Sequence, residues 1–381
     1  MEISSASLPP GFSFETRKNF YTIKGVLGTG GFGITYLAGC RPVGVPHDEL
    51  EILVAIKEHF IGKYSSRNPE DYRVVYPKSA ESVVNSSLRE FLAETRRLSM
   101  INGGHRHIVS ILEVFTANNT AYYSMDYLGR ESLESYVLRN GPLSEHRMWE
   151  IMEPVINAVG YLHSHRVTHL DIKPQNIMLS AGIDGKQQGV LIDFGLSKHY
   201  DEQDNPTSTM RSVGVSHGFA PLEQYAGISS FSPKADVYAL GATAFFCLTG
   251  KIPPSAPDRS PSDVAKMLEV RVPPLSVSTK NAVADAMELQ PEARTDTPRE
   301  ILHPSDQVAV WMKHFRRVAP VDSSAYFAAR RAAADADDHD DDDDDEDDAP
   351  VKDPRSTAFS RIFAILMLLL LIAGWLYTRF T

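Results

Sequence analysis

A short stretch near the middle of the chain, VTHLDIKPQNIML at 167–179, concentrates polar groups that could do chemistry. Asp171, Lys173 and Asn176 lie within six positions, and Pro174 excludes a regular helix there because proline has no backbone N–H to donate. A carboxylate, a cation and a carboxamide on one constrained loop can serve as a base, a charge-neutralising group and a metal ligand. The sequence therefore predicts a reactive loop held between apolar segments.

A second carboxylate follows this loop. Asp193 ends the apolar run of LIDFGLS and comes seventeen positions after Asn176. Carboxylate and carboxamide oxygens are hard ligands that suit Mg²⁺. An Asp-Phe-Gly turn could simply end a strand, but its place behind the reactive loop favours a joint role. Asn176 and Asp193 are therefore the predicted magnesium ligands.

Two features nearer the N-terminus could bind phosphate. GTGGFG, Gly28 to Gly33, fits Gly-x-Gly-x-x-Gly and stands between two strand-like runs. It could be a structural hairpin, or a lid whose backbone N–H groups approach phosphate oxygens because glycine has no Cβ. A dinucleotide fold would need a helix after the motif. Lys57 in the apolar strand VAIK is expected to face a cleft and need an anion, and Glu94 on the next helix could pair with it.

These residues need a scaffold of strands and helices to hold them. From about Phe20 to His314, apolar segments alternate with turn signals, which is typical of a globular α+β protein. Strands are expected in FYTIKGVLGTGGFGITYLAG and ILVAIKEHF. A helix is expected at about 87–100, and another in RMWEIMEPVINAVGYLHSHR. The order is strands, one helix, more strands, then helices.

In this order the motifs resemble those of bacterial eukaryotic-type (Hanks-type) serine/threonine protein kinases. The resemblance covers roughly residues 20–305 and rests on the glycine-rich loop, VAIK, HLDIKPQN, DFG, APLE, DVYALG and the arginine of PEARTD. Each motif alone is weak to moderate, whereas the ordered set is specific. The resemblance implies a bilobal α+β fold, with a β-rich N-lobe at about 20–125 and a helical C-lobe at about 129–314. It also implies ATP and Mg²⁺ as cofactors.

The resemblance assigns roles to the matching positions. Asp171 should accept the proton of the substrate hydroxyl, and Lys173 should balance charge on the transferred group. Lys57 should hold the α- and β-phosphates of ATP and pair with Glu94, with Asn176 on the metal as above. The remaining nucleotide contacts should come from Leu27, Gly28, Gly30, Gly33, Thr35, Ala55, Asp126, Leu128 and Met178, behind a gatekeeper at Met125.

Later motifs should shape the substrate side. Glu223 and Arg294 should form a buried ion pair that anchors the activation segment, and Asp236 should brace the catalytic loop. Ser216 stands where a threonine of the substrate-binding loop is usual in the family. A lysine two residues after the catalytic aspartate is the family's serine/threonine signature, so Lys173 implies protein substrates phosphorylated on serine or threonine.

The chain also departs from the family pattern. Leu170 replaces the arginine that commonly meets an activation-loop phosphate, which puts that switch in doubt. Thr35 stands where a valine usually packs on adenine. Lys57 and Glu94 are 37 residues apart, longer than the family needs. The polar stretch within 58–90 is therefore expected to be a surface insertion, either a tolerated loop or a regulatory contact.

Charge and cysteine content limit the other classes of function. The 381 residues carry a net charge of −11, and the run at 335–348 contains twelve acids; without these twelve charges the remainder is +1. No basic field therefore favours nucleic-acid binding. The two cysteines, Cys40 and Cys247, make no disulfide framework, which fits a reducing compartment.

The two ends of the chain differ from its middle. Residues 1–19 form a polar lead without a secretory signal, and 315–360 should be an extended, acidic, disordered linker. The uncharged run IFAILMLLLLIAGWLY lies between Arg361 and Arg379. As a helix of about 25 Å it is short for a bilayer core of about 30 Å, but flanking arginines can reach the interfaces. A buried core helix is the alternative to a transmembrane helix at 361–379.

The expected location is the inner membrane, crossed once, with the kinase side in the cytoplasm. Lys352, Arg355 and Arg361 precede the uncharged run, and positive residues favour the cytoplasmic side. The lipid bilayer is thus an expected partner.

Two other functions are compatible with the kinase resemblance. A membrane-anchored pseudokinase could act as a scaffold, but Lys57, Asp171, Asn176 and Asp193 are all present. A small-molecule kinase could share the fold, but APLE, DVYALG and the late arginine normally build a peptide-docking segment. An active protein kinase is the leading hypothesis.

Overall fold

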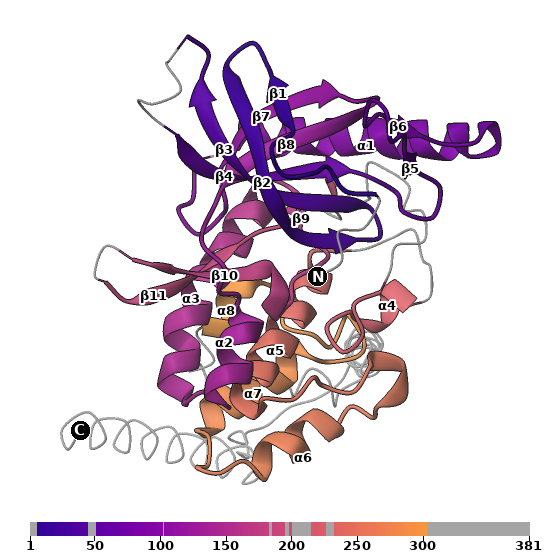
Figure 1. Cartoon of the computed structure of the whole chain (residues 1–381). Helices are drawn as coiled ribbons and strands as arrows, with labels where there is room; N and C mark the ends of the chain where they lie inside the picture. The colour runs from indigo at the N-terminus through magenta and orange to yellow at the C-terminus, as the bar shows by residue number, and fades with distance from the viewer. Residues whose placement is uncertain are drawn as a thin grey trace, which may run out of the picture. The chain divides into compact units, whose positions relative to one another are not determined.

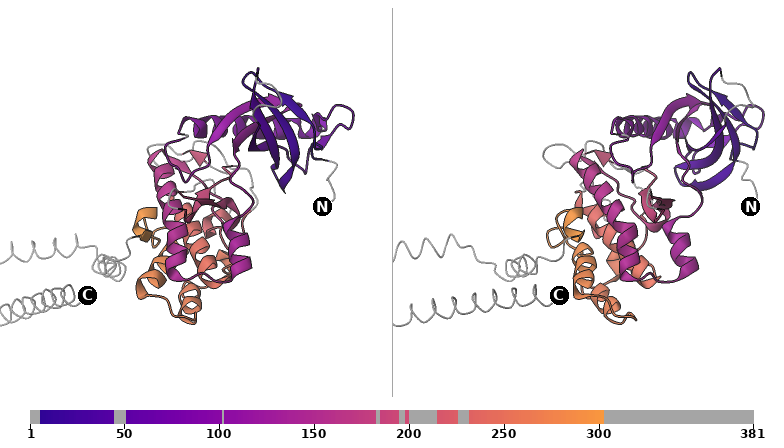
Figure 2. Two further views of the ribbon diagram at one scale, coloured as in Figure 1. Left: turned by 60° about the vertical axis from the view of Figure 1, so that its left-hand side comes forward. Right: turned by 90° about the vertical axis from the view of Figure 1, so that its left-hand side faces the viewer.

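The computed structural model describes residues 6–44, 51–101, 103–182, 185–194, 198–199, 215–225 and 232–302. They form a β-rich N-terminal lobe and a helical C-terminal lobe (Figure 1), as the predicted α+β class requires. Figure 2 shows the same two lobes from the side. The predicted linker and membrane segment lie outside the described residues. No described helix is both long and apolar enough to cross a bilayer.

The N-lobe is built on one antiparallel sheet of six strands in the order β1-β2-β3-β4-β8-β7. The strands are β1 (Ser13–Glu15), β2 (Asn19–Gly30), β3 (Gly33–Pro42), β4 (Ile52–His59), β7 (Ile111–Ala117) and β8 (Thr120–Asp126). Buried tyrosines and aliphatic residues from β2, β3, β4 and β8 make the core of this lobe. The sheet therefore holds the glycine-rich hairpin, the strand of Lys57 and the strand that leads to Asp126 in one body.

The N-lobe begins earlier than the expected boundary at residue 20. Leu8 is fully buried, and Phe14 of β1 packs into the same core. β1 pairs with β2, with Phe14 opposite Tyr21. The described part of the lead is thus a packed part of the lobe, because its apolar side chains cover the end of the sheet.

The expected surface insertion is largely structured. It contains β5 (Ser66–Arg67), β6 (Val74–Val75) and a short η1 (Lys78–Ala80), and helix α1 already begins at Glu81 and runs to Met100. Phe60 and Val74 join the core of the N-lobe, and Ile61 packs in a small cluster with Ala80. The prediction of a polar surface loop is wrong for these residues, because apolar side chains spaced through the polar stretch pin it to the sheet.

The C-lobe is a set of helices around one core. They are α2 (Leu133–Asn140), α3 (Glu145–Ser164), α4 (Leu222–Tyr225), α5 (Lys234–Thr249), α6 (Asp263–Glu269), α7 (Val277–Ala286) and α8 (Pro298–Leu302), with η3 (Ala256–Asp258). In α3, buried residues recur at helical spacing from Met148 to Leu162, and Ser144 caps the first turn by accepting from the N–H of Arg147. Helix α5 is buried on all sides and forms the centre of the lobe.

Short strands and turns between α3 and α4 carry the polar loop. They are β9 (Val167–Thr168), η2 (Pro174–Asn176), β10 (Ile177–Ala181), β11 (Gln187–Leu191) and β12 (Lys198–His199). β10 pairs with β11, and β9 pairs with β12. The polar loop is thus held at its two ends by β9 and β10, each of which is paired with another strand.

Candidate active site

The loop at 169–176 is held in place by the side chain of Asp236 on α5. The fully buried carboxylate of Asp236 accepts from the backbone N–H of His169 at 2.8 Å and of Leu170 at 2.8 Å. Leu170 has φ of 65°, a left-handed conformation that is unfavourable for a leucine. The bracing role predicted for Asp236 is confirmed, since its two hydrogen bonds hold this strained turn in place.

Asp171 lies at the centre of a compact polar cluster. Lys173 Nζ lies 2.9 and 2.8 Å from the two carboxylate oxygens of Asp171. Ser216 Oγ donates to Asp171 Oδ1 at 2.7 Å and accepts from Lys173 Nζ at 3.0 Å. The predicted base, the predicted cation and the predicted substrate-side serine therefore meet at one point, although Ser216 is 45 residues from Asp171 along the chain.

Asn176 connects this cluster to the predicted metal position. Its Nδ2 donates to the backbone O of Asp171 at 2.8 Å and to Asp171 Oδ2 at 3.0 Å. Its amide nitrogen is thereby oriented, so the Oδ1 oxygen is the atom of this side chain that could bind a metal ion. The backbone O of Asn176 accepts from the N–H of Ile192 at 2.9 Å, so Asp193 follows directly beside it.

The donor set of this position suits Mg²⁺. Asn176 and Asp193 offer hard oxygens, and Mg²⁺ commonly takes one or two protein oxygens and completes its shell with water and substrate phosphates. Among the described residues no cluster of three or more histidine, cysteine or acidic side chains could hold a metal alone. The two oxygens therefore fit a magnesium ion that also binds a phosphorylated substrate.

Lys57 differs from the sequence expectation in its partner. Its Nζ pairs with the carboxylate of Asp193, whereas Glu94 pairs with Arg97 on the next turn of α1 at 3.5 Å. The expected Lys57–Glu94 ion pair is not among those formed by the described side chains. Lys57 reaches the carboxylate at the end of the DFG strand instead, and Arg97 supplies a cation to Glu94 on its own helix.

The glycine-rich motif forms the turn of the β2–β3 hairpin, as its place between two strands predicts. Gly28 lies opposite Thr35, and Gly30 lies opposite Gly33. A Cβ on Gly33 would stand 2.6 Å from the backbone O of Glu58, which is shorter than real contacts allow. Glycine at this position therefore permits the hairpin to lie directly on β4, beside Lys57.

The residues predicted to contact adenine line the junction of the two lobes. Ala55 on β4 lies opposite Met125 on β8, and both are buried. Leu27 and Leu128 are partly buried and pack against the same cluster. Met178, on β10, lies opposite Val190, and Asp126 ends β8. Ala55, Leu27 and Leu128 thus belong to one apolar cluster that includes residues of both lobes.

The predicted ion pair between Glu223 and Arg294 is confirmed. Arg294 is fully buried, and its Nη1 donates to Glu223 Oε1 at 2.7 Å while its Nη2 donates to Oε2 at 3.2 Å. The same guanidinium donates to backbone oxygens of Lys234, Glu288 and Leu289. This bidentate pair ties helix α4 to the turn before α8.

Sequence reasoning missed two contributors. His163 Nε2 lies 2.9 Å from Asp236 Oδ2, and Gln224 donates to the backbone O of Leu170 at 3.1 Å. The position of His163 at the end of an apolar helix, four residues before VTHLD, was the available signal. Nothing in the sequence indicated Gln224, because its partner is 54 positions away.

Comparison with known proteins gives one family. The family model described as "Protein kinase domain" matches residues 21–303. The chain is 31% identical over 240 residues to "Serine/threonine-protein kinase PknA" of Nostoc sp.. This match covers 62% of this chain and 38% of that protein. It is 32% identical over 169 residues to "Serine/threonine-protein kinase PrkC" of Bacillus subtilis, covering 44% of this chain and 25% of the relative. The matches thus span well under half of each relative.

Proposed function

The chain belongs to the protein kinase domain family, and we propose that it transfers the γ-phosphoryl group of ATP to serine and threonine hydroxyls of proteins. The observation that carries this proposal is the cluster of Asp171, Lys173, Ser216 and Asn176, held on Asp236 beside the Lys57–Asp193 pair. Lys173 and Ser216 support serine and threonine as acceptors, since they stand where the serine/threonine branch has its signature residues.

Each residue acts by position and charge. Asp171 orients the attacking hydroxyl and takes its proton, and Lys173 neutralises charge on the transferred group. Lys57 binds the phosphates that precede the bond to be broken. When bound at Asn176 and Asp193, Mg²⁺ supplies neutralising charge for the phosphate oxygens. The turn that carries Asp171 is held by the two hydrogen bonds of Asp236, and the Leu170 side chain has no group that could bind a phosphate.

The first test is transfer of labelled phosphate from ATP to a generic basic protein in the presence of Mg²⁺. Asp171→Asn and Lys57→Met should each lower the rate by at least about 100-fold, which corresponds to about 2.7 kcal/mol of lost transition-state stabilisation. Glu292→Gln changes an exposed carboxylate of the C-lobe and serves as the matched control. Circular dichroism should show that all variants remain folded. Undiminished transfer in either active-site variant would remove the assignment.

The same assay separates the alternatives. A scaffold pseudokinase would transfer no phosphate in the wild type, and a small-molecule kinase would leave the protein acceptor unlabelled while consuming ATP. The complete set of catalytic side chains in one cluster favours transfer over a scaffold role. The Glu223–Arg294 anchor favours a protein acceptor, because it stabilises the segment on which a peptide would dock.

We also propose that the uncharged run at 362–377 anchors the chain in the inner membrane, with the kinase lobes in the cytoplasm. The supporting observations are the absence of charge over sixteen residues and the excess of Lys352, Arg355 and Arg361 on the kinase side. An acidic linker would be repelled by anionic headgroups and would hold the lobes away from the surface.

Fractionation tests the anchor. The full chain should stay with membranes through an alkaline carbonate wash, whereas a variant lacking residues 359–381 should be soluble and still transfer phosphate. Release of the full chain by the wash would exclude a spanning helix. An N-terminal tag that external protease can cleave in intact cells would overturn the orientation.

A further inference from the structure

Tyr123 carries a buried hydroxyl that the proposed mechanism does not use. The residue lies on β8 and is 3% exposed, and its hydroxyl has no hydrogen-bond partner among the described residues. Burial of such a hydroxyl opposes folding, because the group gives up its hydrogen bonds to water and receives none in return. Native structures rarely keep an unsatisfied buried group without a reason. Tyr123 is therefore a candidate for a role that is fulfilled when the protein binds a ligand.

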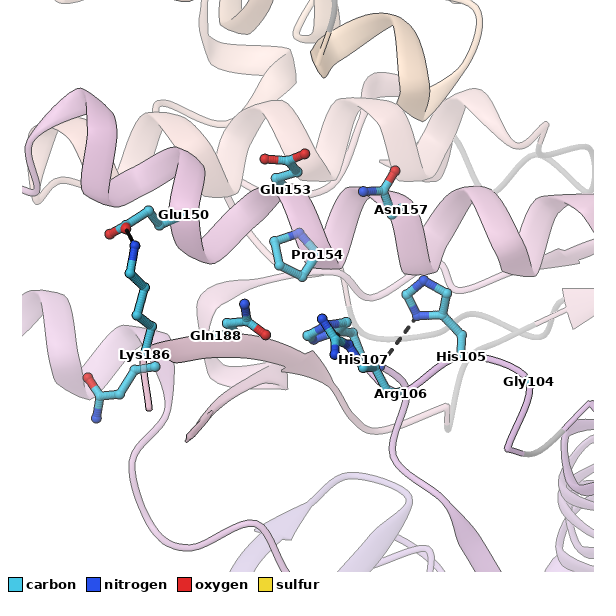
Figure 3. A pocket seen from close by; sticks show the side chains of 11 residues that line it. Gly104, His105, Arg106, His107, Glu150, Glu153, Pro154, Asn157, Lys186 and Gln188 are labelled. Carbon is cyan, nitrogen blue, oxygen red and sulfur yellow. Dashed lines mark hydrogen bonds and ion pairs between the residues drawn. The ribbon is translucent and has the colours of Figure 1, made fainter. Parts of the chain in front are cut away.

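The polar groups of the cavity on the outer face of α3 differ in this respect (Figure 3). This cavity has a volume of about 690 Å³, and neither Tyr123 nor any residue of the catalytic cluster lines it. Arg106, Glu153 and Asn157, which do line it, are exposed. Water can therefore satisfy the polar atoms of these three side chains, whereas solvent does not reach the hydroxyl of Tyr123.

The neighbouring Tyr122 shows how a buried tyrosine is usually satisfied. Side chains alternate between the two faces of a strand, so Tyr122 and Tyr123 point to opposite faces of the sheet. Tyr122 joins the core of the N-lobe, and its hydroxyl donates to Glu58 at 2.7 Å. Tyr123 belongs instead to the apolar cluster that includes residues of both lobes. The unsatisfied hydroxyl is thus on the face of the sheet that is turned towards the C-lobe.

The register of the sheet places Tyr123 beside Lys57. The two residues are directly opposite each other on β8 and β4. Opposite residues of an antiparallel pair point to the same face, with Cβ atoms about 5 Å apart. The ring of Tyr123 stacks on Phe91 of α1, with 5.5 Å between the ring centroids, and Lys57 pairs with the carboxylate of Asp193. Tyr123 therefore lies between α1 and the sheet, beside the Lys57–Asp193 pair.

The charge of Asp193 acts on the hydroxyl of Tyr123. Burial raises the pKa of Tyr123 well above its usual value, and the nearby charge of Asp193 raises it further. The hydroxyl therefore keeps its proton near neutral pH and can serve as a neutral donor. A carboxylate is a favourable acceptor for it, because hydrogen bonds to ionised groups are stronger than those between neutral groups.

We propose that Tyr123 is a positioning residue for Asp193 in the nucleotide-bound enzyme. This inference rests on the proposed function, in which Lys57 binds phosphates and Asp193 binds Mg²⁺. When Lys57 turns to the phosphates, the carboxylate of Asp193 loses this cation. The hydroxyl of Tyr123 then donates to one carboxylate oxygen of Asp193 and leaves the other oxygen for the metal. The hydroxyl is thus satisfied in the bound state, and Asp193 is held in a metal-binding orientation.

Tyr123→Phe removes only the hydroxyl and should have two effects of opposite sign. Without added nucleotide or Mg²⁺, the melting temperature of the variant should exceed that of the wild type by about 2 to 4 °C, because an unsatisfied buried hydroxyl is gone. Tyr122→Phe is the matched control, and its melting temperature should fall because it loses a satisfied hydroxyl. A lower melting temperature for Tyr123→Phe would show that the hydroxyl already has a partner, such as a buried water, and would overturn the proposal.

The Mg²⁺ requirement supplies the second measurement. Binding of a fluorescent ATP analogue is followed by anisotropy over a series of Mg²⁺ concentrations. Tyr123→Phe should need about 10-fold more Mg²⁺ than the wild type for half-maximal binding, since removal of a group that orients a metal ligand weakens metal binding by this order. Tyr122→Phe should need the same concentration as the wild type, because its hydroxyl lies on the other face of the sheet.

The two proposals fail in different ways in this experiment. A wild type that neither binds the analogue nor transfers phosphate would overturn the proposed function, and the role of Tyr123 with it. A wild type that does both, with an unchanged Mg²⁺ requirement in Tyr123→Phe, would exclude the positioning role alone. An equal rise of the Mg²⁺ requirement in Tyr122→Phe would also exclude it, because the effect would then come from a general loosening of the N-lobe.

Discussion

Removal of the buried Arg67 side chain should destabilise the N-lobe severely. Arg67 Nη2 lies 2.6 Å from Glu58 Oε2, and the two side chains are 1% and 0% exposed. The hydroxyls of Tyr36 and Tyr122 each donate to the same carboxylate at 2.7 Å. Burial, reinforced by the charge of Glu58, raises the pKa of both tyrosines, so they remain neutral donors. Arg67 is therefore the cation that balances a fully buried carboxylate.

The magnitude follows from this burial. Arg67→Met leaves the Glu58 charge without its cation, and loss of one partner of a buried ion pair costs about 3 to 5 kcal/mol. Arg67 also donates to backbone oxygens of Ala6 and Tyr72, at 2.7 and 2.8 Å, so the described part of the lead should loosen with it. At about 2 to 3 °C per kcal/mol for a domain of this size, the melting temperature should fall by about 6 to 15 °C.

Urea and thermal unfolding of three variants test the reasoning. Arg73→Met is the matched control, because Arg73 and Asp71 form an exposed pair at 3.6 Å whose loss should cost about 1 kcal/mol or less. Glu58→Gln combined with Arg67→Met removes both charges and keeps an acceptor for one of the two tyrosine hydroxyls, so it should recover part of the loss. If Arg67→Met were as stable as Arg73→Met, the buried pair would not have the role assigned to it.

Three further outcomes are expected. Burial lowers the pKa of His59 to about 4, below the 6.5 of an unfolded chain. The free energy of unfolding should therefore be constant above pH 6.5 and decline by up to about 3 kcal/mol as the pH falls towards 4. Urea unfolding of His59→Gln should show a shallower decline with pH, and an unchanged slope would contradict this origin. Arg294→Lys cannot reproduce the bidentate pair with Glu223, so its free energy of unfolding in the same assay should be lower by about 3 kcal/mol. A variant as stable as the wild type would argue against a structural anchor. Ser216→Ala should lower kcat/KM for phosphoryl transfer about 10-fold, which corresponds to about 1.4 kcal/mol, while Ser216→Thr should keep nearly the wild-type rate. Equal rates in the wild type and both variants would show that Ser216 does not orient Asp171.

The sequence by itself was sufficient to single out residues that meet in the candidate site and to predict the class of fold. Asp171, Lys173 and Asn176 are close in sequence and share a loop that Pro174 keeps out of a helix, so local chemistry revealed them. The order of strands and helices could also be predicted, because alternation and helical spacing record which face of each element is buried. Asp193 was recognisable for a related reason, since it ends an apolar strand.

Only the tertiary structure decided which distant groups meet. The partner of Lys57 is Asp193, 136 positions away, although the sequence favoured Glu94. The sequence placed Arg67 in a polar insertion, but the fold buries it against Glu58 and packs part of the insertion into the core of the N-lobe. Long-range pairing of charges depends on how separate elements pack, and residue spacing along the chain does not encode it.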